Sequence, residues 1–91
     1  MKRKLEYKSD GRSGYVIYSD DNTRFSMYYE FAGGDCVAIV NIPSVDEWIK
    51  ITGCPLSSRD EILTFVGSQI VKDQTSKGHF KIANNFIEIY E

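Results

Sequence analysis

The sequence has little of the residue types from which metal and catalytic sites are built. It contains two cysteines, Cys36 and Cys54, and one histidine, His79. Structural zinc takes four Cys or His ligands at short spacings, which these residues do not provide. We therefore expect a non-enzymatic protein with no metal and no cofactor. Cys54 lies a few residues before a predicted helix, where a thiol can become reactive. The sequence does not decide whether Cys54 is reactive.

Other absences exclude whole classes of protein. No apolar run approaches the roughly 18 residues of a membrane span, and no secretory segment follows Met1, so we expect a cytoplasmic protein away from membranes. The net charge is −2. Without Lys2–Lys4, the 11 basic residues fall to eight against 13 acidic ones. Nucleic acid binding needs several phosphates neutralised by Lys or Arg, so we expect no nucleic acid partner.

What is present indicates one α+β domain over residues 1–91. Apolar residues make up 42% of the chain and aromatic residues 13%, which is typical of a globular domain with an aromatic-lined sheet. Polar and apolar residues alternate in three segments that turn signals separate, which predicts an antiparallel β-meander of three strands. A fourth strand is expected at one edge. The four segments are residues 14–20, 23–31, 36–42 and 3–8.

Two-residue turns at Asp21-Asn22 and Gly33-Gly34 predict the register of this meander. The second turn sets Phe31 opposite Cys36. Both turns place their apolar residues on the same side of the sheet, so we expect this side to be the core face. Its predicted residues are Val16, Tyr18, Phe25, Met27, Tyr29, Phe31, Cys36, Ala38, Val40 and Ile42.

Two helices are expected after the meander. Ser44 and Glu47 form the pattern of a capping box, which predicts a short helix that ends before Gly53 and is anchored by Trp48 and Ile49. A longer helix is expected from Ser57 or Ser58, with Ser58 and Glu61 as its capping box. It carries an apolar stripe that packs on the core face. The stripe consists of Ile62, Leu63, Val66, Gln69 and Ile70, with Phe65 on its border and Gly67 off its centre.

The last segment, residues 79–90, fits either one long strand or a hairpin that turns at Asn84-Asn85. The hairpin is the better prediction, because it sets Lys81 opposite Glu88 and sorts the apolar residues onto the inner side. Strands then occur in runs with the helices between them, which is typical of an α+β fold rather than of a βαβ array.

The predicted register leaves a second sheet face that is unusually apolar. Its centre holds Tyr15, Ile17, Tyr28, Val37 and Ile39, with Tyr28 opposite both Tyr15 and Ile39, and polar residues lie around them. An apolar centre with a polar rim is typical of an interface. Another part of the chain can cover this face, either the short helix with Trp48 or the C-terminal hairpin. The alternatives are a second copy of the chain, another protein or a small ligand.

The sequence alone does not identify a function. The leading hypothesis is a small protein-interaction domain that forms a homodimer through the second face of its sheet. One alternative is a small-ligand binder or enzyme with a pocket between sheet and helices, where Cys54, His79 and the tyrosines supply the polar groups. Another is an acidic inhibitor or immunity-type partner of another protein, an idea that rests on size, acidity and exposed aromatic residues.

Overall fold

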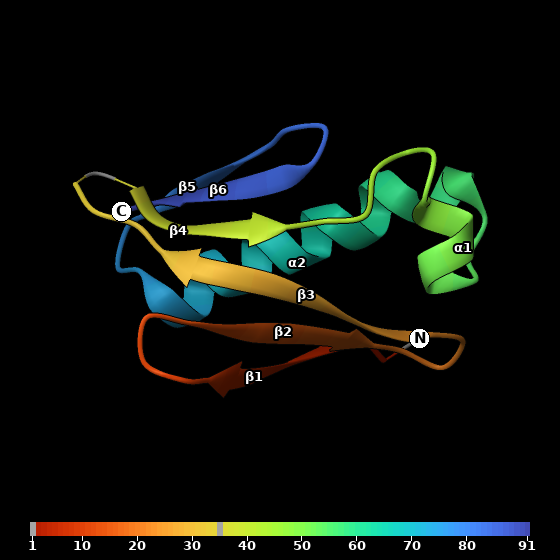
Figure 1. Ribbon diagram of the computed structural model, residues 1–91, viewed down its shortest axis with the longest axis horizontal. Coiled ribbons are helices and arrows are strands. Elements are labelled where there is room, and N and C mark those ends of the chain that lie inside the picture. Colours follow the sequence, from red (N-terminus) through yellow and green to blue (C-terminus); the bar gives the residue numbers. More distant parts are fainter. Residues whose placement is uncertain (1, 35) are drawn as a thin grey trace.

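The computed structural model describes residues 2–34 and 36–91. It confirms the α+β class, with an antiparallel sheet of six strands in the order β1-β2-β3-β4-β6-β5. Figure 1 shows α2 crossing the sheet on one side and α1 at one end of the molecule. The elements are β1 (Lys4–Ser9), β2 (Ser13–Ser19), β3 (Arg24–Phe31), β4 (Cys36–Asn41), α1 (Trp48–Thr52), the 3-10 turn η1 (Leu56–Ser58), α2 (Arg59–Gln74), β5 (His79–Ile82) and β6 (Phe86–Tyr90).

The first two hairpins of the sheet follow the prediction. β1 pairs with β2 as the expected fourth strand at the sheet edge. In the β2–β3 hairpin, Tyr18 lies opposite Phe25 and Val16 opposite Met27. The turn between these strands is closed by Asp20, whose Oδ1 accepts the backbone N–H groups of Asn22 and Thr23. Side chains of this type favour tight turns because they bond the backbone locally.

The β3–β4 register differs from the prediction by two residues. Phe31 pairs with Ala38, not with Cys36, and Tyr29 pairs with Val40. The common two-residue turns need positive φ at the first central residue, here Gly33, or at both, but of the two glycines only Gly34 has it. The loop is therefore longer. A shift of two residues keeps the paired residues of β3 and β4, from Ala38 to Val40, on their predicted faces, because the side chains of a strand alternate with period two.

The start of β4 does change faces. The register between β4 and β6 shifts between Cys36 and Ala38, as in a β-bulge. Cys36 pairs with Tyr90 on the outer face, which is the second face of the sheet, opposite α2, so its predicted place on the core face is wrong. Val37 was predicted on the outer face, and this is also wrong, because its side chain packs against the core. A bulge adds one residue to a strand and thereby reverses the alternation of side chains next to it.

The C-terminal hairpin is confirmed. Phe80 pairs with Ile89 and Lys81 with Glu88, as predicted. β6 then joins the sheet beside β4, which leaves β5 at the second edge. Phe80 packs against the core, and its ring lies on Gly67 of α2.

The short helix forms later than predicted. Ser44 contacts Glu47 through its side chain, but α1 begins only at Trp48 and has no side-chain cap. Trp48 is fully buried against Phe25 and donates its Nε1–H to the carbonyl oxygen of Pro55 at 3.0 Å. Ile49 is 61% exposed, so its prediction as an anchor is wrong. Successive helical residues point about 100° apart, and a helix of five residues can bury only one side.

The long helix α2 begins at the predicted place but without the predicted capping box. Ser58 is its N-cap residue, yet its hydroxyl donates to the carbonyl oxygen of Pro55. Glu61 instead accepts a hydrogen bond from Arg3.

The apolar stripe is confirmed on the core face of the sheet except at Gln69, which is only half-buried and donates a hydrogen bond to Asp73. Gly67, predicted off the centre of the stripe, is buried under Phe80. The buried residues of the stripe are Ile62, Leu63, Val66, Gly67 and Ile70, with Phe65 partly buried.

A buried cation joins the start of α2 to two loops. Arg59 is 8% exposed. Its Nη2 donates to the carbonyl oxygens of Pro43 and Asn84, at 2.9 and 3.0 Å, and its Nε reaches Pro43 as well. The guanidinium group therefore satisfies carbonyl groups after β4 and between β5 and β6.

Gly67→Ala should destabilise the protein, although alanine is the better helix former. Helix propensity alone favours alanine by about 1 kcal/mol. The added Cβ would overlap the Phe80 ring, and overpacking of this kind costs about 1–3 kcal/mol. The measurement is the free energy of unfolding in urea. Ser68→Ala, one position away and exposed, is the control and should change it little. An equally stable Gly67→Ala variant would contradict the close contact.

Arg59→Met should lower the free energy of unfolding by about 2–3 kcal/mol, because the carbonyl groups of Pro43 and Asn84 lose a charged donor. Arg59→Lys should recover only part of the loss, since an ammonium group lacks the planar fork of guanidinium. Arg24→Met removes an exposed cation and serves as the control. Chemical denaturation measures all three variants, and unchanged stability of Arg59→Met would refute the anchoring role.

Candidate functional site

The outer face of the sheet is the side opposite α2. Tyr15 and Tyr28 lie opposite each other on β2 and β3, with their rings in edge-to-face contact at 5.7 Å between centroids. They are 50% and 37% exposed. Ile39 shares the face and is half-buried, whereas Ile17 is only 7% exposed. Of the five predicted interface residues, the structure thus groups four on this face, and Val37 packs on the core side.

The contacts around Tyr28 differ from the predicted ones. The shifted register sets Ile39 opposite Glu30, not opposite Tyr28. The carbonyl oxygen of Tyr28 accepts a hydrogen bond from Asn41 Nδ2, and its hydroxyl donates to Glu30. The predicted contact between Tyr28 and Ile39 is therefore wrong. Tyr28 is instead hydrogen-bonded to the Glu30 carboxylate and the Asn41 side-chain amide.

The outer face extends farther than the sequence predicted. β6 adds Phe86 opposite Asn41 and Tyr90 opposite Cys36. The ring of His79, on β5, stacks on Tyr90 with centroids 5.0 Å apart. Aromatic residues thus occur on this face from β2 to β5. Sequence reasoning missed this part because it did not predict that β6 lies beside β4.

Charged residues of both signs lie between these aromatic rings. Glu30 and Glu88 flank Ile39 on its two sides, and Lys81 lies opposite Glu88. Lys8 lies opposite Tyr15. The Tyr90 hydroxyl donates to Glu88, and this bond is the main cause of a raised pKa of Tyr90. The face therefore has no strong net charge of one sign.

Both helices pack on the opposite face. Trp48 of α1 contacts Phe25, and the stripe of α2 joins the same core as Val16 and Met27. The C-terminal hairpin is part of the sheet itself. Neither of the two segments that were candidates to cover the outer face does so in the part of the chain that the structure describes.

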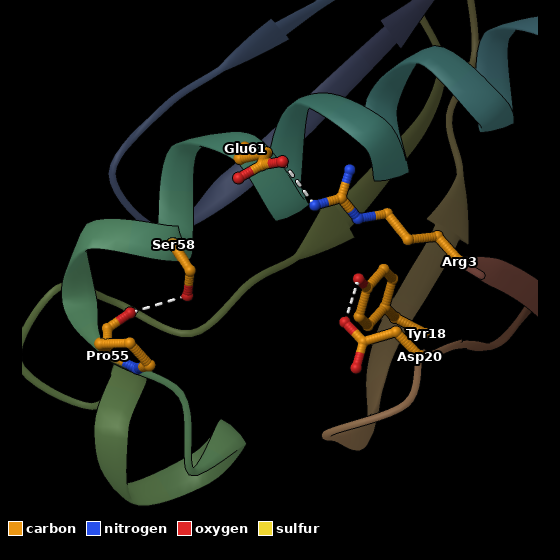
Figure 2. Close-up of polar contacts among 6 residues, drawn as sticks. All are labelled: Arg3, Tyr18, Asp20, Pro55, Ser58 and Glu61. Carbon is orange, nitrogen blue, oxygen red and sulfur yellow. Dashed lines mark hydrogen bonds and ion pairs between the residues drawn. The ribbon is translucent and has the colours of Figure 1, made fainter. Parts of the chain in front are cut away.

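A polar cluster apart from the outer face lies beside the start of α2 (Figure 2). Arg3 Nη2 donates to Glu61 at 2.6 Å, and the Tyr18 hydroxyl donates to Asp20 at 2.6 Å. Burial and the bond to Asp20 raise the pKa of Tyr18. Burial acts to raise the pKa of Asp20, but hydrogen bonds from Tyr18 and from two backbone N–H groups outweigh it and lower the pKa.

This cluster borders a cleft of about 270 Å³ that Cys54 and Ser58 also line. Each of its carboxylates already accepts a hydrogen bond from within the protein, Glu61 from Arg3 and Asp20 from Tyr18. The cluster therefore ties the N-terminal segment and the β2–β3 turn to α2. These contacts give the cluster a structural role, although the buried Nε of Arg3 has no hydrogen-bond partner among the described residues.

The structure does not bring Cys54 and His79 together. Cys54 is buried in the connection after α1, whereas His79 stacks on Tyr90 beside the C-terminus, at the other end of the sheet (Figure 1). Between the sheet and the end of α2 lies an apolar cavity lined by Tyr29, Val40 and Ile70, among others, with a volume of about 20 Å³. That volume holds about one water molecule.

Asp20→Asn should remove a stabilising contribution that depends on pH. Because the pKa of Asp20 is lower in the folded protein, this contribution is fully present above its ordinary value of 3.8. It is lost as the pH falls through the folded value. The measurement is the free energy of unfolding as a function of pH. The difference in the free energy of unfolding between wild type and Asp20→Asn should shrink in acid. Tyr18→Phe, which removes one of the hydrogen bonds to Asp20, should also reduce the pH-dependent contribution. Parallel pH curves would contradict this assignment.

Within residues 2–34 and 36–91, no group of three His, Cys, Asp or Glu side chains is arranged to hold a metal ion. No helix in this described part combines the length and apolar character needed to cross a membrane. The chain matches no family model, no curated protein and no solved structure.

Proposed function

We propose that this protein is a non-enzymatic interaction domain that pairs with a second copy of itself through the outer face of its sheet. The supporting observation is that both helices pack on the other face, while Tyr15 and Tyr28 are exposed at the centre of this one. Solvated faces of antiparallel sheets are mostly polar. An aromatic centre with charged residues between and around the rings has the composition of an interface core with its rim.

The size of the face suits such a contact. A specific interface covers about 800 Å² on each partner, or about a seventh of the 5601 Å² surface of this chain. Six strands at a spacing of about 4.8 Å make a face about 24 Å wide, which is of the right order. Face-to-face packing of two sheets is also a common arrangement of antiparallel strands.

The charges of the face favour a second copy as the partner. Under two-fold symmetry each residue meets the same surface on the other chain. A face with charge of one sign would repel its copy. This face instead mixes acidic residues, Glu30 and Glu88, with basic ones, Lys8 and Lys81. Tyr28 is the best probe of the contact, because it lies near the centre and is partly exposed.

Tyr28→Glu should halve the mass of the particle in solution, since a carboxylate would be buried without a partner at the centre of the contact. Light scattering during size-exclusion chromatography measures the mass, and circular dichroism tests the fold. Ser68→Glu adds the same charge on the exposed side of α2 and should leave the mass unchanged. A wild-type protein that is monomeric at micromolar concentration would refute the proposal, as would an unchanged mass of a folded Tyr28→Glu variant.

A further inference from the structure

The sheet ends at β1, which pairs only with β2 in the part of the chain that the structure describes. Figure 1 shows β1 as the outermost strand on its side. Ile70 and Gln74 near the end of α2 line a cavity together with Tyr7 of β1 and residues of β2, β3 and β4, so the helix lies against the inner face of the sheet, β1 included. The edge of β1 is therefore accessible to another strand. Such edges are templates for pairing unless their side chains prevent it.

The backbone of β1 offers a regular set of unpaired groups at this edge. The Asp10 N–H donates to the carbonyl oxygen of Ser13 on β2. In an antiparallel ladder the direction of the backbone groups alternates along the strand. Lys8, Glu6 and Lys4 therefore also point their backbone groups toward β2. The N–H and C=O groups of Leu5, Tyr7 and Ser9 point away from the sheet.

The side chains on the outer face of β1 alternate in charge. Lys4, Glu6 and Lys8 share this face, and Asp10 continues the pattern beyond the strand. Residues that lie opposite each other in an antiparallel pair interact directly, and like charges there are destabilising. An alternating series can therefore pair with itself, but only in a register that sets opposite signs against each other.

We propose that the β1 edge pairs antiparallel with β1 of a second copy, with Tyr7 opposite Tyr7 of that copy. In this register Glu6 meets Lys8 of the second copy, and Lys8 meets its Glu6. Lys4 and Asp10 meet in the same way. The outward backbone groups of Leu5, Tyr7 and Ser9 then form the ladder. The neighbouring register, with Glu6 opposite Glu6, sets Lys4 against Lys8 and is repulsive throughout.

The inner side of β1 is held in place for this pairing. The Tyr7 hydroxyl donates to Asp73 of α2 at 2.7 Å, and Leu5 and Tyr7 both pack against the core. The strand is thus ordered before it meets a partner, which lowers the entropy lost on association. The opposite edge differs, because β5 has only four residues and no acidic residue that could oppose its Lys81 in a second copy.

The edge pairs through backbone groups and the face through side chains, and only Lys8 belongs to both, so the two contacts can be tested apart once the face contact is disabled. With both contacts the wild type should hold four chains, so in the Tyr28→Glu background, where the face contact is disabled, the edge alone should still give a dimer of half that mass. Adding Glu6→Lys sets Lys against Lys twice and should weaken this dimer about tenfold or more. Adding Lys8→Glu as well restores opposite charges and should restore the dimer. Asp46→Lys, an exposed charge change near α1, is the control.

Hydrogen exchange of individual amides reads the edge directly in the unmodified protein. The amides of Leu5, Tyr7 and Ser9 should exchange slowly in wild type and faster in Glu6→Lys. This measurement does not require the Tyr28→Glu background. Equal exchange in both proteins would overturn the edge pairing, and failure of Lys8→Glu to restore the dimer would overturn the register. A monomeric, folded Tyr28→Glu variant would overturn the edge while supporting the face. An unchanged dimer in that variant would do the reverse.

Discussion

The packing of α2 on a single face of the sheet is the contact on which the rest of the structure depends. One apolar stripe, with Leu63 and Val66 at its centre, meets the inward side chains of strands that alternate with period two. The long helix of this 91-residue chain is α2, and α2 covers one face of the sheet. The other face keeps its tyrosines at the surface, and this asymmetry is the origin of the proposed interface.

Polar contacts between distant segments set the position of that helix. Arg59 joins its start to the loops after β4 and β5, Arg3 reaches Glu61 from the N-terminal segment, and Tyr7 reaches Asp73 from β1. Exposed ion pairs contribute little stability by themselves. The buried guanidinium of Arg59 is different, because its removal leaves carbonyl groups without a donor in a place that water reaches poorly.

The two proposed surfaces would recognise a partner through different chemistry. The outer face presents side chains, so it depends on aromatic area and on the mixture of charges. The β1 edge presents backbone groups, which are the same in every strand, so its specificity rests on the charge series of Lys4, Glu6 and Lys8. Joined at the edge, two copies would form one continuous sheet whose outer faces lie side by side. Face pairing would then bring two such sheets together.

Local patterns in the sequence determined most of the fold. The turn at Asp21-Asn22, the stripe of α2 and the turn at Asn84-Asn85 each depend on neighbours in the chain, and each was predicted. The alternation of side chains also placed Tyr15, Tyr28 and Ile39 on the outer face. Only the tertiary structure decided the faces of Cys36 and Val37, because the bulge forms where β4 pairs with the distant strand β6. The same long-range pairing added Phe86 and Tyr90 to the outer face, since strand order across a sheet is set by contacts between segments far apart in the chain.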